Sequence, residues 1–240
     1  MSLPFLILET GKPVAPMRRH GGFPHWIRVA AGLGREQARV VDVEAGQPLP
    51  KPRGHAGILI TGSGAMVSDR LDWSERAAQW LQAAVDAEVP VFGICYGHQL
   101  LAHALGGEVG DNPRGREMGT VEVRLNASAA ADPLFAGKPD AFRAQATHLQ
   151  TVLRPPAGAV VLAETDLDAC AAFRLGDQAW GVQFHPEFSA RHMQGYIAAR
   201  APNLRHEGFN PIGMHAAVRS SPEARGILRQ FVRRASHRHR

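Results

Sequence analysis

A cysteine stands between two glycines where a strand-like segment meets a helix-like one. The apolar run at 90–94 leads into Gly-Ile-Cys-Tyr-Gly at residues 93–97, and a helical pattern follows at 98–105. In a sharp strand-to-helix turn the nucleophile adopts a strained backbone conformation, and small residues two before and two after it let strand and helix approach closely. The spacing therefore predicts a nucleophile elbow, with Cys95 in the turn between a strand and a helix.

The start of a helix also favours a thiolate, because the positive end of the helix dipole stabilises negative charge. Cys95 is thus a candidate nucleophile, and the alternative is that it is simply a small buried hydrophobic residue. The other cysteine, Cys170, lies beside an alternating apolar run and is expected to be structural. Two cysteines in 240 residues are too few for a disulfide framework and are compatible with a reducing cytoplasm.

Strand-like runs alternate with helix-like segments along the chain. This pattern predicts an open, mostly parallel α/β sheet with helices on both faces, and shorter alternating runs after residue 119 predict antiparallel additions. The expected strands are 4–9, 38–43, 57–61, 90–94, 121–125, 141–146, 160–164, 171–174 and 180–184. The expected helices are 72–87, 189–200 and 221–234, the last two with Ser189 and Ser221 as N-caps, and 202–211 is expected to be loop. We expect a single domain over residues 1–240, with its core at about 6–200 and a loop, a C-terminal helix and a basic tail at 201–240.

A candidate general base follows the last expected strand. A thiolate that forms an acyl-enzyme needs a group to hold its proton and return it to the leaving ammonia, and the pKa of histidine suits both steps. Of twelve histidines, His185 directly follows the run at 180–184, with Pro186 and Glu187 after it. Open α/β sheets bind ligands at the carboxyl ends of their strands, and Glu187 can fix the imidazole tautomer as the third member of a triad.

The same histidine and glutamate could instead be metal ligands, with Cys95 as a third. No Cys-x-x-Cys or His-x-x-x-His pair accompanies them in the sequence, and a zinc-bound thiolate would not be free to attack. We therefore expect no metal and no cofactor.

The two motifs together resemble those of the class I glutamine amidotransferases. The first is FGICYGHQ at residues 92–99, the second is GVQFHPEF at 181–188, and they occur in the expected order. The likeness is greatest to the glutaminase part of GMP synthase and to its free-standing relatives, and it extends over about residues 6–200. It implies a flavodoxin-like fold and an enzyme that hydrolyses the γ-amide of glutamine through a γ-glutamyl thioester.

The resemblance also implies further site residues. The loop at 60–64 would supply an oxyanion hole, with the backbone N–H groups of Ser63 and Tyr96 as the donors, although the loop could be only a turn. Gly62, Gln99 and His148 are the candidates for holding the substrate.

Two departures from the family pattern concern these residues. Family members often carry two adjacent glycines and a proline in the oxyanion loop, whereas Ser63 and Gly64 stand here. A family segment of Ser-His-Gly-Asp character is represented by Thr-His-Leu-Gln at 147–150.

The net charge of +5 is concentrated at one end of the chain. Six arginines follow Glu223 and account for more than the whole excess, so the remainder is close to neutral. Such an end is usually a solvated tail, with contact to a polyanion as the alternative, and we expect no nucleic-acid partner. No signal peptide and no run of 18 apolar residues is evident, so we expect no membrane span and a cytoplasmic protein.

Three functions are compatible with these motifs. Residues 201–240 lack a G-x-x-x-x-G-K phosphate loop, so we expect the chain either to supply ammonia to a synthetase partner or to use water as the acceptor. The first function is a glutaminase or amidotransferase, and the second is a γ-glutamyl peptidase or hydrolase. The third is a catalytically silent binding protein, against which the complete Cys, His and Glu set argues.

We predict that Cys95→Ser abolishes glutaminase or γ-glutamyl hydrolase activity and leaves the fold intact, because a serine hydroxyl lacks the low pKa of the thiol. The matched control, Cys170→Ser, should retain activity. Labelling with a glutamine-like electrophile, followed by peptide mapping, checks the assignment. A label on Cys170 that spares Cys95 would contradict it.

Overall fold

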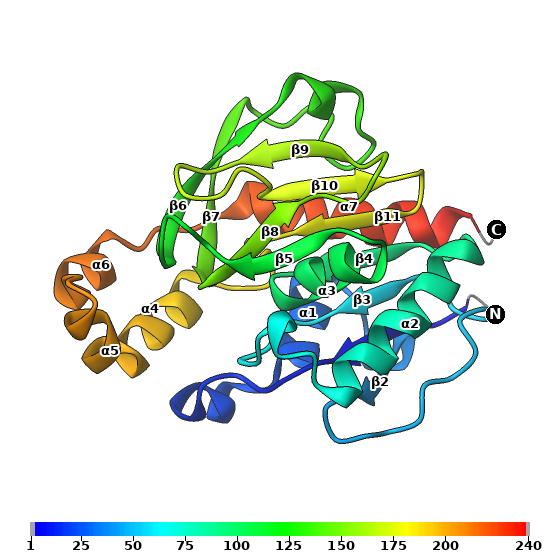
Figure 1. The fold of residues 1–240 in the computed structure, drawn as a ribbon, viewed down its shortest axis with the longest axis horizontal. Coiled ribbons are helices and arrows are strands. Elements are labelled where there is room, and N and C mark those ends of the chain that lie inside the picture. Colours follow the sequence, from blue (N-terminus) through cyan, green and yellow to red (C-terminus); the bar gives the residue numbers. More distant parts are fainter. Residues whose placement is uncertain (1–2, 239–240) are drawn as a thin grey trace.

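The computed structural model describes residues 3–238, and a nine-stranded sheet lies at its centre (Figure 1). Its strands are β1 (Phe5–Glu9), β2 (Ala38–Asp42), β3 (Ile58–Ile60), β4 (Val91–Ile94), β6 (Glu117–Leu125), β7 (Ala141–His148), β9 (Val160–Glu164), β10 (Ala172–Leu175) and β11 (Ala179–Val182). Two further strands, β5 (Glu108–Asp111) and β8 (Gln150–Arg154), form a separate antiparallel pair.

The sheet has a parallel half and an antiparallel half. Its order is β2-β1-β3-β4-β11-β10-β9-β6-β7, and the first five strands are mutually parallel. These five follow the 2-1-3-4-5 order of flavodoxin-like folds. The last four strands add to β11 in antiparallel fashion. The predicted fold class, a parallel core with antiparallel additions, is confirmed.

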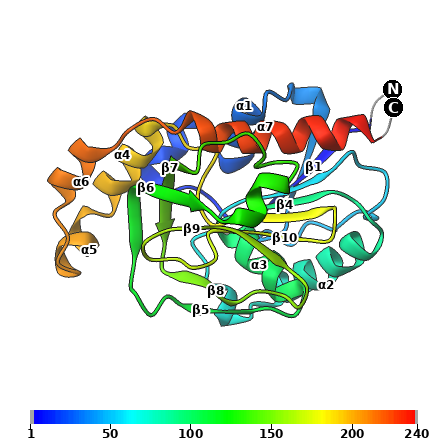
Figure 2. The same cartoon turned by 90° about the horizontal axis from the view of Figure 1, so that it is seen from above.

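Helices cover both faces of the sheet, with α1 and α7 on one face and α2 and α3 on the other (Figure 2). The α-helices are α1 (Phe23–Ala31), α2 (Asp72–Asp86), α3 (Tyr96–Ala104), α4 (Ala190–Ala199), α5 (Ala201–His206), α6 (Pro211–Ala217) and α7 (Pro222–His237). The 3-10 helices are η1 (Ala15–His20), η2 (Arg35–Gln37), η3 (Val67–Asp69) and η4 (Ala127–Ala131). No helix within residues 3–238 has the length and apolarity needed to cross a membrane.

The strand period of two divides the apolar core between these faces. In β1, Phe5 and Ile7 join one buried cluster, which includes Phe231 of α7, whereas Leu6 and Leu8 join another, which includes Leu81 of α2. β1 is buried on both faces, as expected for a central strand of a parallel sheet.

A third buried cluster lies beside the sheet, where η1 and α1 meet α4. Its aromatic members include Phe23, Trp26, Phe188 and Tyr196. From this cluster α4, α5 and α6 extend away from the sheet, in yellow and orange in Figure 1. The strand β11 and the helix α4 are joined by residues 183–189, which contain the predicted base.

The expected loop at 202–211 is wrong, because α5 and α6 occupy most of it. Each helix carries a proline in its first turn, where the absent N–H would be unpaired in any case. The side chain of Asn210 accepts a hydrogen bond from the Gly213 backbone N–H and caps α6. Prolines that seemed to interrupt helical structure therefore mark where helices begin.

Other boundaries also differ from expectation. The strand expected at 180–184 ends at Val182, because the chain turns so that the His185 N–H donates to the Gln145 carbonyl at 2.7 Å. Ser189 caps α4 as predicted, accepting from the His192 N–H, whereas Ser221 makes no capping hydrogen bond. The elements α1, β5 and β8 were not expected.

The basic tail begins later than predicted, since α7 continues to His237. The apolar stripe of this helix includes Ala235, and the Ser236 hydroxyl donates to the Val232 carbonyl. Arg229 donates to the Ala30 carbonyl and so connects α7 to α1. Residues 239 and 240 of the predicted tail lie outside the described residues.

We predict that deleting residues 236–240 lowers the melting temperature by about 2–4 °C, the shift that a loss of about 1 kcal/mol causes in a protein of this size. The deletion removes the end of α7 and its hydrogen bond to Val232. Deleting only 238–240 is the control, and it should leave the melting temperature unchanged. Equal melting temperatures for both truncations, measured by calorimetry, would contradict this account of α7.

Candidate active site

Cys95 lies at the turn between β4 and α3, with the strained backbone angles φ 52° and ψ −104°. A Cβ at position 93 would lie 2.3 Å from the Gly97 carbonyl oxygen, and one at position 97 would lie 2.7 Å from the Ile60 carbonyl oxygen. Only glycine fits these two positions. The turn inferred from the Gly-x-Cys-x-Gly spacing is present.

His185 and Glu187 lie next to Cys95, and all three residues are buried. The Nδ1 atom of His185 is 2.8 Å from the Glu187 carboxylate, so this nitrogen carries the hydrogen. Within residues 3–238 the other ring nitrogen, Nε2, has no hydrogen-bond partner. A Cβ on Gly62 would lie 3.1 Å from the His185 ring and 3.9 Å from the Cys95 Cβ, so Gly62 contacts both residues.

Two aromatic side chains hold the His185 ring in place. Phe188 stacks on it with ring centroids 4.1 Å apart, and Phe23 of α1 stacks at 6.4 Å. Together with the Glu187 hydrogen bond, these contacts leave the imidazole little freedom to rotate.

The electrostatics favour a thiolate beside an imidazolium. Burial alone would raise the pKa of Cys95, but the charges of His185 and His148 outweigh it and lower the pKa below its usual value. Burial alone would lower the pKa of His185, but the charges of Glu187 and Cys95 outweigh it and raise the pKa. Burial and Asp168 raise the pKa of the second cysteine, Cys170, so its thiol stays protonated.

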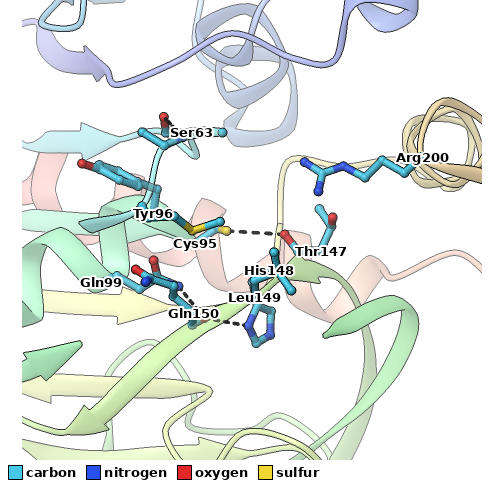
Figure 3. Close-up of a pocket in the computed structure, with 12 residues that line it drawn as sticks. Ser63, Cys95, Tyr96, Gln99, Thr147, His148, Leu149, Gln150 and Arg200 are labelled. Atoms are coloured by element: carbon cyan, nitrogen blue, oxygen red, sulfur yellow. Dashed lines mark hydrogen bonds between the residues drawn. The ribbon is translucent and has the colours of Figure 1, made fainter. Parts of the chain in front are cut away.

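The two predicted oxyanion donors flank the cysteine. Ser63 and Tyr96 both line the pocket with Cys95 (Figure 3), and in the described part of the chain neither backbone N–H has an acceptor. The loop that carries Ser63 is held by Thr10, whose hydroxyl donates to the Thr61 carbonyl and whose N–H donates to the Thr61 hydroxyl. The Gly97 N–H also donates to the Thr61 carbonyl, which joins this loop to the start of α3.

Gln99 and His148 line the same pocket, but they differ in whether they have a hydrogen-bonding atom left for a ligand. The Gln99 amide nitrogen donates to the Gln150 carbonyl and to the Gln183 side chain, which leaves its oxygen available as an acceptor. Both ring nitrogens of His148 are engaged, one with the Gln150 carbonyl at 2.9 Å and the other with Glu117 at 3.0 Å. His148 therefore contributes positive charge, and its ring has no nitrogen left for a ligand.

The pocket also includes three residues outside the segments considered from the sequence, namely Ala65, Met66 and Arg200. Its remaining lining residues, Gly64, Thr147, Leu149 and Gln150, belong to the segments at 60–64 and 147–150. Arg200 reaches the pocket from the junction of α4 and α5, 12 residues after the second motif. No sequence signal distinguishes this arginine from the others. Among residues 3–238 no group of three His, Cys, Asp or Glu side chains is arranged to hold a metal ion.

Comparisons with known proteins find one family repeatedly. The model of the family "Glutamine amidotransferase class-I" matches residues 28–201. A GMP synthase (glutamine-hydrolyzing) of Aeropyrum pernix is 40% identical over 149 residues, which are 62% of this chain and 26% of that protein. The corresponding Clostridium botulinum protein is 36% identical over 138 residues, covering 57% and 25%. The chain thus spans about a quarter of the length of these relatives.

Solved structures of similar fold cover nearly the whole chain. A glutamine amidotransferase from Thermotoga maritima has a TM-score of 0.77 at 21% identity, covering 98% of this chain and 99% of its own. A glutamine amidotransferase from Methylobacillus flagellatus has a TM-score of 0.76 at 24% identity, covering 97% and 95%. At these identities the likeness concerns the fold.

We predict that iodoacetamide alkylates Cys95 rapidly at pH values below the ordinary thiol pKa of about 8.5, because a lowered pKa preserves the thiolate as the pH falls. In His185→Asn, burial and the Glu187 charge raise the pKa and only the His148 charge still lowers it, so the pKa should rise and alkylation at pH 7 should slow by at least about tenfold, the effect of one pKa unit. Cys170→Ser is introduced into both the parent protein and the His185→Asn variant, so that Cys95 is the one thiol that can react. A wild-type rate profile with its midpoint at or above 8.5 would contradict the ion pair.

Proposed function

The chain belongs to the class I glutamine amidotransferases, a family of enzymes, and we propose that it hydrolyses the γ-amide of glutamine with Cys95, His185 and Glu187 as its catalytic residues. The observation that carries the proposal is the closeness of a strained, buried cysteine to a histidine that a carboxylate orients and whose charge lowers the pKa of the cysteine. The match to the family confirms the resemblance drawn from the two motifs.

In the proposed first step, the Cys95 sulfur attacks the γ-carbonyl carbon of glutamine. The electrons of the carbonyl double bond move to oxygen, where the N–H groups of Ser63 and Tyr96 can receive the charge, a contribution of a few kcal/mol each in such sites. His185 then gives its Nε2 proton to the leaving nitrogen, the C–N bond breaks, and ammonia leaves a γ-glutamyl thioester.

In the second step, a water molecule replaces ammonia. His185, now neutral, takes a proton from the water as it attacks the thioester carbon, and the C–S bond breaks to release glutamate. The thiolate and imidazolium are thereby restored. Glu187 accepts from Nδ1 throughout, which keeps Nε2 toward the reacting atoms and stabilises the charged ring.

Gly62 and Gln99 are proposed to shape the substrate site. Gly62 leaves room for the His185 ring beside Cys95, where a larger side chain would crowd the ring. The unengaged Gln99 oxygen can accept a hydrogen bond from the substrate ammonium group. For His148, we propose a supporting role in which its charge favours the Cys95 thiolate.

The triad chemistry does not determine whether the released ammonia is used by a partner enzyme. The GMP synthases in the comparison are about four times longer than the matched segment, so what they do with ammonia belongs to those proteins. We propose that this chain either delivers ammonia to a synthetase partner or acts as a hydrolase. Arg200 in the pocket favours keeping γ-glutamyl peptides as a second substrate class, because such peptides carry an additional carboxylate.

We predict that the isolated protein releases ammonia from glutamine or glutamate from γ-glutamyl dipeptides, and that Cys95→Ser releases neither. Coupled assays for the two products, run side by side, separate the functions. Ammonia release that exceeds dipeptide cleavage indicates an amidotransferase, and the reverse ratio indicates a γ-glutamyl hydrolase. If neither product forms, and a glutamine-like electrophile also fails to label Cys95, the protein is a silent binder and the proposal is wrong.

A further inference from the structure

Arg200 forms one wall of the pocket that contains Cys95. It stands where α4 ends and α5 begins, and Figure 3 shows its side chain extending from this helical region toward Cys95 and Thr147. None of the steps proposed for the triad uses it. Its position at the pocket, opposite the wall formed by Ser63 and Tyr96, requires a separate explanation.

The guanidinium group of Arg200 has no anionic partner in the part of the chain that the structure describes. The guanidinium instead lies over the ring of Tyr196, 5.9 Å from the ring centroid. The nearby carboxylate of Glu207 is already engaged by Arg116 through two hydrogen bonds of 2.6 and 2.8 Å. Arg200 is therefore a half-buried cation beside Arg116. Within residues 3–238 it forms no ion pair, although the nearby Tyr196, Cys95 and Glu207 partly offset the effect of its burial.

Such a charge is costly to keep away from water. Burial and the charge of Arg116 both disfavour the protonated form and lower the pKa of Arg200. An arginine nevertheless stays protonated in proteins, so an anion that binds beside it would compensate for its partial desolvation. The planar guanidinium donates in a fork that matches a carboxylate.

The rest of the pocket lining also favours a negatively charged ligand. Among its lining residues within 3–238 there is no aspartate or glutamate. The other cationic residue, His148, is occupied by Glu117 and the Gln150 carbonyl. Arg200 is thus the lining group that can receive a carboxylate from a bound molecule.

We propose that Arg200 is a specificity-determining residue that binds a carboxylate of the γ-glutamyl substrate. The inference rests on the proposed function, and it adds that the part of the pocket beside Arg200 binds a carboxylate. The carboxylate belongs either to the α-carbon of the γ-glutamyl group or to the amino acid that leaves, as in a γ-glutamyl dipeptide. Both sources present the same group to the guanidinium, and substrates that differ by one carboxylate distinguish them.

The test compares Arg200→Gln with Arg205→Gln, an exposed arginine in the adjacent helix α5. The substrates are L-glutamine, its α-amide, γ-glutamylglycine and γ-glutamylglycinamide. Loss of a charge-assisted hydrogen bond should lower kcat/KM of Arg200→Gln by about 10- to 100-fold on the substrate that carries the recognised carboxylate, mainly through KM. The control variant should match the wild type on all four substrates.

The pattern across substrates identifies the carboxylate. If Arg200 binds the α-carboxylate, the wild type prefers glutamine to its α-amide and Arg200→Gln loses that preference. If it binds the leaving-group carboxylate, Arg200→Gln loses activity on γ-glutamylglycine and keeps it on γ-glutamylglycinamide. An equal loss on all four substrates, or no loss on any, overturns the proposal.

A second measurement separates this inference from the proposed function. γ-Glutamylglycine should protect Cys95 from iodoacetamide in the wild type, and Arg200→Gln should need at least about tenfold more of it, even if neither protein turns it over. Wild-type protection without turnover would refute the proposed catalysis and keep the carboxylate subsite. Equal protection of wild type and Arg200→Gln would refute the subsite.

Discussion

The close approach of β4, α3 and the loop after β3 is the constraint on which the site depends. Gly97 packs against Ile60, and the Gly97 N–H donates to the Thr61 carbonyl, so the loop after β3 and the start of α3 are held together. The Cys95 N–H donates to the Val182 carbonyl at 2.8 Å, which attaches the same turn to β11. Three adjacent parallel strands therefore bring Cys95, the loop that carries Ser63 and the segment that carries His185 to one edge of the sheet.

The backbone positions the residues of the site, and their charges stabilise one another. The residues around the cysteine are buried, where ionised groups are costly unless they compensate one another. Cys95, His185 and Glu187 do so as neighbouring groups, and a second buried pair is formed by Glu117 and His148, which itself lines the pocket. Because these groups are shielded from water, each charge acts strongly on its neighbours.

The sequence predicted the parallel half of the fold and the candidate triad because both depend on local patterns. The glycines two residues before and after Cys95 indicate a sharp strand-to-helix turn, and the apolar run before His185 indicates a strand that ends at this histidine. Each of these patterns spans only a few consecutive residues. The side of the pocket that contains Arg200 could not be predicted in this way. Arg200 enters the pocket through the packing of α4 against η1, and α5 and α6 were not predicted because their first-turn prolines resemble loop residues. Neither the neutralisation of Glu207 by Arg116 nor the exposure of Arg200 to the pocket has a signature in the order of residues.

The aromatic cluster beside the sheet joins recognition to chemistry. Phe188 contacts the His185 ring on one side and Tyr196 of α4 on the other, and the Arg200 guanidinium lies over that same Tyr196 ring. The base and the arginine thus belong to one mechanically continuous stack of side chains. A ligand that displaced the guanidinium would therefore disturb the Tyr196 and Phe188 rings, which pack one after the other against the His185 imidazole.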